Sequence, residues 1–378
     1  MRVFRGLDGA RGLLATAVVL SHAVQLTGVA NGAAIYPFFQ AFGDVSVRVF
    51  IMLSGFVITH LLTERRERYG VYITRRFFRL YPVYLACLAL GLVATGLFFH
   101  VLPTHPWGEL LPISPRLSGQ IESSAGLGYP AHLIAHLTML HGVIPDTVFY
   151  GSEFLFLPPA WSLSLEWQFY LIAPFVLAAL STRLGAAALC LAALGAFMAY
   201  KTGVFGSFVL PSFLPGALHW FAVGIASRLF LPAIERRPRL FGVLALALTG
   251  ALALARPAHL EFFLWALLFV HAIGALPVLT RALRPLLENP PVEALGARSY
   301  PLYLAHYPVI ELLVAGAALA GLGYGTMAAL TLAAAYPLSL ALAGLLHHRL
   351  EKPGIAFGAQ VAALLRDGRL GRRVAPRG

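Results

Sequence analysis

The chain has 378 residues, of which 59% are hydrophobic and only 12% are charged, with a mean hydropathy of +0.77. Soluble domains carry about 25% charged residues, so this composition excludes an ordinary soluble protein and predicts an all-α bundle that spans a membrane several times. The net charge of +12 does not indicate nucleic acid binding, because its placement follows the predicted topology. Cys87 and Cys190 lie in apolar runs and give neither a zinc motif nor a disulfide framework.

Apolar runs near the length of a transmembrane helix, about 20 residues, recur along the whole chain. The first is longer than the apolar part of a signal peptide and no clear cleavage site ends it, so we predict a retained helix. A polytopic helix bundle of about ten transmembrane helices is therefore expected. The predicted spans are 10–30, 45–63, 78–99, 161–180, 184–200, 208–231, 240–256, 261–280, 300–321 and 325–347.

The basic residues give an independent test of this map. With the N-terminus in the cytoplasm and the sides alternating, all but a few of the 28 lysines and arginines fall in cytoplasmic segments. This is the bias that the positive-inside rule describes, and it predicts that both termini are cytoplasmic. Arginine far outnumbers lysine and alanine is abundant, which is typical of a GC-rich bacterial genome. We therefore expect an integral protein of the bacterial cytoplasmic membrane, with lipid around it and no nucleic acid partner.

Two segments lie outside the regular alternation of spans. Residues 100–160 form a long, proline-rich outer connection, in which Leu133, Leu137 and Leu140 have the spacing of a short amphipathic or re-entrant helix. Such a long connection either takes part in function or covers the bundle as a lid, and the sequence leaves both open. At the other end, residues 1–353 are predicted to form the transmembrane domain and residues 354–378 a basic cytoplasmic tail.

The first predicted helix carries ionisable residues, which are costly in a bilayer core. Arg11 and His22 are eleven residues apart, which at about 100° per residue returns to within about 20° of the same face, and Asp8 lies near this stripe. The rise of about 16 Å from Arg11 places His22 near the middle of the membrane. His22 is either a catalytic or transport residue or a histidine that merely bonds a neighbouring helix.

Two further helices carry candidate polar groups. Arg75, Arg76 and Arg79 cluster at the predicted N-terminus of the 78–99 helix, where they suit a phosphate clamp or simply anchor the positive-inside end. Glu166 lies about 7 Å below the outer boundary of the 161–180 helix, behind Trp161, and so requires a partner or a role.

The remaining polar positions have a structural interpretation at least as good as a functional one. In "SYPLYLAHYPVIELL", Tyr303, His306 and Glu311 lie increasingly deep from the cytoplasmic side, and a hydrogen-bonded Tyr/His cluster is the simpler explanation. Ser54 and Gly55 permit close helix packing and do not form the Gly-x-Ser-x-Gly elbow of hydrolases.

Taken together, these segments resemble acyltransferase family 3, the multispanning acyl-CoA-dependent O-acyltransferases that include O-antigen acetylases. The resemblance covers residues 5–353 and rests on the order and spacing of several motifs. They are Arg11-x10-His22, "LSGF" at 53–56, Arg76-x-x-Arg79, "WSLSLE" at 161–166, "SYPLYLAHYPV" and "EKP". Ile51 and Ala10 are small departures, and both are apolar.

The resemblance implies a cytoplasmic acyl-CoA donor, most simply acetyl-CoA, a hydroxyl acceptor that is often a sugar, and an essential His22. The predicted catalytic residues are then His22 and Glu166, and Arg11, Arg75, Arg76 and Arg79 would bind the donor. A surface polysaccharide, a lipid-linked glycan or a glycosylated natural product would be the acceptor, and no metal is expected. The predicted acceptor-binding residues are Asp44, Ser54, Trp161, Ser162, Tyr303 and His306. The rival interpretation is a proton-coupled transporter that uses His22, Glu166 and Glu311.

Overall fold

A computed structural model describes residues 4, 6–29, 36–65, 67–111, 122 and 128–366, and in these residues all regular structure is helical. The last twelve residues of the predicted basic tail, 367–378, lie outside this set. The helices that build the bundle are α1 (Leu7–Thr27), α2 (Tyr36–Glu64), α3 (Tyr69–Val101), α6 (Ala160–Leu180), α7 (Arg183–Lys201), α8 (Leu214–Leu229), α10 (Pro238–Ala255), α11 (Leu260–Ala272), α12 (Pro277–Leu287), α13 (Pro290–Ala297), α14 (Ser299–Leu319), α15 (Tyr324–Leu346) and α16 (Lys352–Arg366). A polytopic helical membrane protein is thereby confirmed.

Seven of the described helices are long and apolar enough to cross a membrane, or eight if one bent pair counts as a single span. Apart from the bent pair, two of the ten predicted spans do not reach this standard. α1 has 21 residues but carries Asp8, Arg11 and His22 among them, and α8 has only 16 residues. The count of ten spans and the cytoplasmic placement of both termini therefore stay predictions.

The predicted span at 261–280 is not one helix. α11 ends at Ala272 and α12 begins at Pro277, and the two helices are bent by 98° to each other. Gly274 adopts a positive φ of 68° at the break, a conformation that favours glycine, and Pro277 then starts the next helix. The turn sends α12 and α13 back toward α1, where α13 packs.

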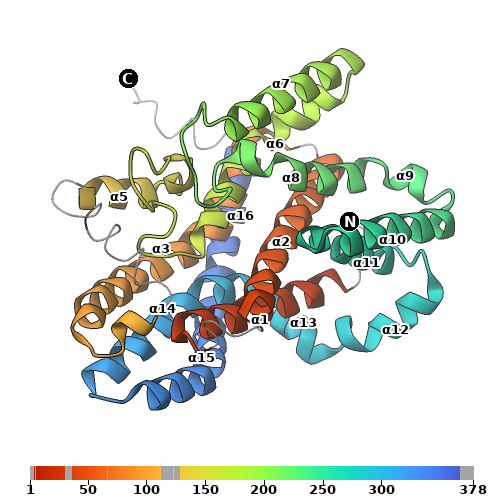
Figure 1. The fold of residues 1–378 in the computed structure, drawn as a ribbon. Helices are drawn as coiled ribbons and strands as arrows, with labels where there is room; N and C mark the ends of the chain where they lie inside the picture. Colours follow the sequence, from red (N-terminus) through yellow and green to blue (C-terminus); the bar gives the residue numbers. More distant parts are fainter. Residues whose placement is uncertain are drawn as a thin grey trace, which may run out of the picture.

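Helix α2 runs through the centre of the bundle, with α1, α6, α8 and α11 packed around it (Figure 1). Glycines allow a close crossing of α2 with α8. A Cβ atom on Gly224 would lie 2.0 Å from the Met52 carbonyl oxygen, and one on Gly55 would lie 2.7 Å from the Phe221 oxygen. The packing role predicted for Gly55 is therefore confirmed.

Helix α3 begins at Tyr69, about nine residues before the predicted start, and continues for 33 residues. Arg76 and Arg79 consequently lie about 10 and 15 Å above the helix start. The expectation that a helix N-terminus would assist these arginines in binding an anion is wrong, because the positive end of the helix dipole acts only within the first turn.

The outer connection packs on the bundle through its own short helix, α5 (Gly128–Leu137), which agrees with the predicted amphipathic helix. The hydroxyl of Tyr84 donates to the His136 carbonyl at 2.6 Å, and Gly91 passes so close to Phe156 that a Cβ would lie 2.0 Å from its oxygen. α5 lies beside α3 at the left of Figure 1. These contacts support the interpretation of the connection as a lid on α3.

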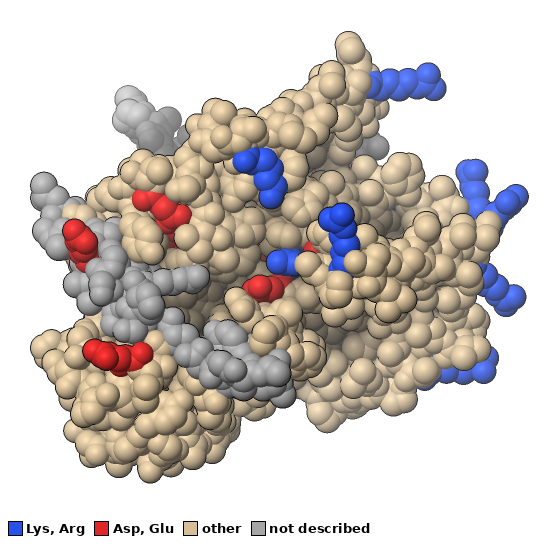
Figure 2. All heavy atoms as spheres, in the orientation of Figure 1, with Lys and Arg blue, Asp and Glu red and all other residues tan. Residues whose placement is uncertain are grey.

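The opposite end of the chain also packs on α3. A π turn at His347–Glu351 joins α15 to α16, so the helix continues through residue 353, the predicted end of the transmembrane domain. Gly354 and Gly358 lie against Phe78. Figure 2 shows that many lysines and arginines of the visible face lie along the edge that carries α9 (Leu231–Ile234), α10 and α12, and that acidic residues lie mainly on the other half.

Candidate active site

A cavity of about 340 Å³ lies where α1, α2, α3, α6 and α14 meet. Each helix contributes polar side chains to a wall that is otherwise formed by leucine, isoleucine, valine and phenylalanine. The polar residues that line it are Asp8, Arg11, Ser54, Arg76, Arg79, Ser162, Glu166, Tyr170, Ser299, Tyr300 and Tyr303. Five separate segments of the sequence thus form one site.

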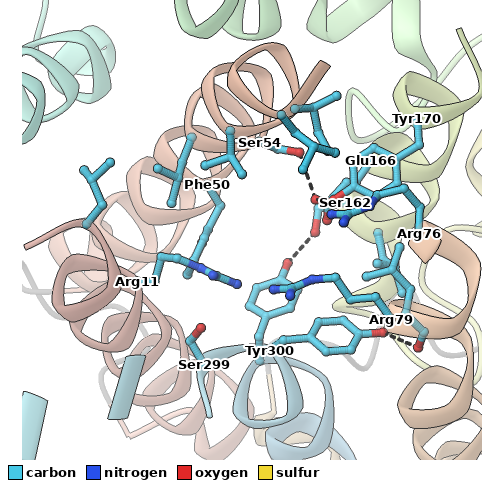
Figure 3. Close-up of a pocket in the computed structure, with 18 of the residues that line it drawn as sticks. Arg11, Phe50, Ser54, Arg76, Arg79, Ser162, Glu166, Tyr170, Ser299 and Tyr300 are labelled. Carbon is cyan, nitrogen blue, oxygen red and sulfur yellow. Dashed lines mark hydrogen bonds between the residues drawn. The ribbon is translucent and has the colours of Figure 1, made fainter. Parts of the chain in front are cut away.

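Three arginines converge on this cavity from two helices. Arg11 of α1 and Arg79 of α3 point toward one another across it, and Arg76 lies beside Glu166 and Tyr170 (Figure 3). The Nε of Arg76 is buried without a hydrogen-bond partner. Arg11 has an acidic partner in Asp8 at 3.7 Å, a carboxylate whose side chain is 77% exposed, whereas no described acidic side chain forms a salt bridge with Arg76 or Arg79. The cavity therefore concentrates positive charge that an anionic ligand would neutralise.

Glu166 lies in the same cavity as the arginines. Its Oε1 accepts a hydrogen bond from the Ser54 hydroxyl at 2.8 Å and another from Tyr170. The sequence placed Glu166 near the outer boundary and the arginines at the cytoplasmic end of their helix, whereas the structure brings them together in one cavity, because α3 carries Arg76 and Arg79 into the bundle. The hydrogen bonds to Glu166 come from the hydroxyls of Ser54 on α2 and Tyr170 on α6.

His22 forms its hydrogen bond with another histidine. Its Nδ1 lies 2.8 Å from Nε2 of His306, a residue of α14 that is fully buried. The His22 and Tyr307 rings also form a T-shaped pair, with their centroids 5.3 Å apart. α1 is one continuous helix, so His22 lies about 16 Å along it from Arg11, as predicted.

Tyr303 connects the histidine pair to the cavity. Its hydroxyl lies 2.7 Å from the Ser162 hydroxyl, and its ring lines the cavity. His306 follows three residues later on α14, a rise of about 4.5 Å. The His22–His306 pair thus lies one helical turn beyond the Tyr303 wall of the arginine cavity.

Besides His22 and His306, three predicted site residues lie outside the cavity lining. Arg75 forms a salt bridge with Glu67 at 2.6 Å, and Trp161 packs against the main hydrophobic core. Asp44 is exposed on α2, ten residues before Ser54 and so about 15 Å away along the helix. Their predicted roles in binding donor or acceptor stay predictions without a place in this cavity.

Two tyrosines of the site were missed in the sequence. Tyr170 follows Glu166 by four residues and so shares its helix face, a spacing that could have identified it. Tyr300 precedes Tyr303 by three residues, and its hydroxyl donates to the Leu80 carbonyl at 2.7 Å. Across the described part of the chain, no group of three or more histidine, cysteine, aspartate or glutamate side chains is arranged to hold a metal ion.

Comparison with known sequences places this site in a family. The family described as "Acyltransferase domain" matches residues 4–348. A protein named as a membrane-bound transacylase, BcsY of Komagataeibacter xylinus, is 30% identical over 171 residues, which are 44% of this chain and 36% of the relative. Acyltransferase MdmB of Streptomyces mycarofaciens is 28% identical over 172 residues, 44% of this chain and 38% of the relative.

A third relative, "Protein 2 in picA locus" of Rhizobium radiobacter, is 39% identical over 88 residues, 22% of this chain and 41% of the relative. The matches therefore span less than half of the length of each of these relatives. No solved structure matches the chain. The family match nevertheless covers nearly the whole chain, from α1 into the π turn after α15, and includes every helix that lines the cavity. The chain therefore belongs to the acyltransferase 3 family of membrane acyltransferases.

Proposed function

We propose that this membrane acyltransferase takes its acyl group from acyl-CoA, most simply acetyl-CoA, and transfers it to a hydroxyl group of a sugar-containing acceptor. The observation that carries the proposal is the convergence of Arg11, Arg76 and Arg79 on one cavity without enough acidic partners to neutralise them. Coenzyme A carries several phosphates, and a guanidinium binds phosphate through two parallel hydrogen bonds.

The distribution of polar groups supports an orientation of the donor. The phosphates would bind the arginines, and the acyl-pantetheine arm would extend past Tyr303 toward His22. The basic residues favour the arginine end as the cytoplasmic one, which is where acyl-CoA is made. Since the named relatives are bacterial proteins, we place the chain in the bacterial cytoplasmic membrane.

His22 is the proposed general base. Its ring takes the proton from the acceptor hydroxyl as the oxygen attacks the thioester carbonyl carbon. The carbon–sulfur bond then breaks, and the imidazolium returns the proton to the leaving thiolate, which gives an ester and free CoA. Proton transfer of this kind is worth about 10²–10⁴-fold in rate.

Glu166 and the hydroxyl groups near it suit an acceptor with several hydroxyls. A sugar can donate to the carboxylate of Glu166 and exchange hydrogen bonds with Ser54, Ser162 and Tyr303. Surface polysaccharide, lipid-linked glycan and glycosylated natural product all carry this chemistry. Mass spectrometry of surface glycans and small metabolites from cells with and without the protein identifies the acceptor by the loss of one acyl mass.

Binding of coenzyme A to protein in lipid nanodiscs tests the donor site directly. A charged hydrogen bond contributes about 1.5–3 kcal/mol, so Arg76→Ala and Arg79→Ala should each weaken CoA binding by about 10- to 100-fold. Arg75→Ala is the matched control, because Arg75 is adjacent in sequence, equally charged and bound to Glu67 outside the cavity lining. If all three variants lose CoA affinity equally, or if none of them loses it, the proposed donor site is contradicted.

A further inference from the structure

The two histidine rings, His22 and His306, meet nearly edge to edge. Their planes are 9° apart and their centroids are 5.1 Å apart, while the Nδ1 atom of His22 lies 2.8 Å from the Nε2 atom of His306. Adding two ring radii to the nitrogen–nitrogen distance gives about the centroid separation, so the rings lie almost in one plane along the hydrogen bond. An N–H on one ring therefore points directly at the lone pair of the other.

A backbone carbonyl decides which ring donates this hydrogen bond. The second nitrogen of His306, Nδ1, lies 3.2 Å from the carbonyl oxygen of Leu302. A carbonyl can only accept, so Nδ1 of His306 must carry the hydrogen. In a neutral imidazole the other nitrogen is then bare, which makes Nε2 of His306 an acceptor, and Nδ1 of His22 must carry the hydrogen between the rings.

From this chain of bonds we infer that His306 is the positioning residue of His22, which it holds as the Nδ1–H tautomer with the Nε2 lone pair free to take a proton. The inference replaces the acceptor-binding role predicted for His306. The importance of this tautomer for catalysis rests on the proposed function, in which His22 is the base. The assignment of the tautomer does not rest on it, because it follows from the hydrogen bonds alone.

The contacts around the pair support positioning rather than simple packing. His306 is 0% exposed, so no solvent competes for its nitrogens, and the Tyr307 ring holds the His22 ring from the side. A free histidine side chain prefers the opposite tautomer, with hydrogen on Nε2, and such a ring would present a donor rather than a base to an incoming hydroxyl. When His22 becomes an imidazolium during transfer, its Nδ1–H bond to His306 strengthens, as a carboxylate partner would do in other enzymes.

The tautomer can be measured without any substrate. We suggest ¹⁵N NMR of histidine-labelled protein in nanodiscs at a pH well above about 6.5, where free imidazole is neutral. The difference from a His22→Gln spectrum assigns His22 among the 13 histidines. Wild-type protein should show a protonated Nδ1 and a bare Nε2 on His22. The opposite pattern on His22 would overturn the inference.

Variants of His306 test the cause of the tautomer. His306→Leu removes the acceptor and should shift His22 toward the Nε2–H form, whereas His306→Gln, whose amide oxygen can accept from Nδ1–H, should restore the wild-type pattern. Tyr307→Phe is the control, since it changes a neighbour of His22 and keeps both histidines. An unchanged tautomer in folded His306→Leu protein would refute the role of His306.

A chemical probe gives a second readout. Diethyl pyrocarbonate reacts with a bare imidazole nitrogen. In His306→Leu the bare nitrogen of His22 would be Nδ1, which faces the buried residue 306, so mass spectrometry should find slower modification of His22 in His306→Leu than in His306→Gln. Equal rates in the two variants would contradict the inference. Because neither measurement uses coenzyme A or acyl-CoA, a failed CoA-binding experiment would leave the tautomer result standing, and the reverse also holds.

Discussion

The crossing of α1 with α13 should be among the least tolerant places in the protein, and Gly296→Ala tests it. A Cβ on Gly296 would lie 2.0 Å from the carbonyl oxygen of Asp8. Ordinary contact begins at 3.4 Å, so the two helix backbones must separate by about 1.4 Å at this point. Neither atom belongs to a flexible side chain, so rotation cannot relieve the clash. Overpacking of this kind costs about 1–3 kcal/mol of folding free energy.

The same displacement should reach the site, although Gly296 does not line the cavity. Asp8 is three residues from Arg11 on the same helix, and a shift of about 1 Å in a positioned group can cost about 10²-fold in rate. We therefore expect Gly296→Ala to lower both the thermal unfolding temperature in nanodiscs and the affinity for CoA.

Gly316→Ala is the matched control for this substitution. Gly316 lies in α14, and a Cβ there meets no atom within 4 Å. This variant should keep the wild-type stability or gain up to about 1 kcal/mol from the better helix propensity of alanine. If Gly296→Ala and Gly316→Ala unfold at the same temperature and bind CoA equally, the close helix crossing does not constrain α1 and the reasoning fails.

Three other outcomes follow from the structure. His22→Ala should abolish acyl transfer while the protein still folds and binds CoA, and transfer at a near wild-type rate would rule out the base assignment. Glu166→Gln keeps an oxygen that accepts from Ser54 but loses the charge, so we expect slower transfer with CoA affinity unchanged or higher; weaker CoA binding would contradict this. Glu153, in the outer connection, has both carboxylate oxygens buried without a partner, and burial, assisted by the Asp146 carboxylate, raises its pKa from 4.5 to about 7. The folded state therefore holds a proton that the unfolded state releases, so this residue lowers stability as the pH rises from about 4.5 to about 7. Glu153→Gln should remove that contribution, and unfolding temperatures of the two proteins should diverge across this range and stay apart above it; parallel curves would refute the assignment.

The pH test must compare two proteins, because buried histidines of the same connection act in the opposite direction. Burial lowers the pKa of His136 from 6.5 to about 4 and also lowers that of His141, whose ring stacks on it at 4.1 Å. The unfolded chain takes up protons on these histidines more readily than the folded protein does. The protein therefore loses stability as the pH falls below about 6.5. Only the difference in unfolding temperature between wild type and Glu153→Gln isolates the contribution of the Glu153 carboxylate.

The sequence by itself determined the helical membrane fold, the positions of most helices and the family. Apolar length alone decides whether a segment can cross a membrane, and the motif order in α1, α2, α3, α6 and α14 is local information. Helix periodicity also placed Arg11 and His22 on one stripe, since that relation depends only on the geometry of a single helix.

Tertiary structure alone decided which helices meet and at what depth. Sequence periodicity fixes a face but not a neighbour, so it could not pair His22 with His306, which is 284 residues away, or join Glu166 to Ser54, 112 residues away. The early start of α3 moved Arg76 and Arg79 into the bundle, beside a glutamate expected on the other side. The break between α11 and α12 likewise depends on one glycine conformation and on the docking of α13 against α1.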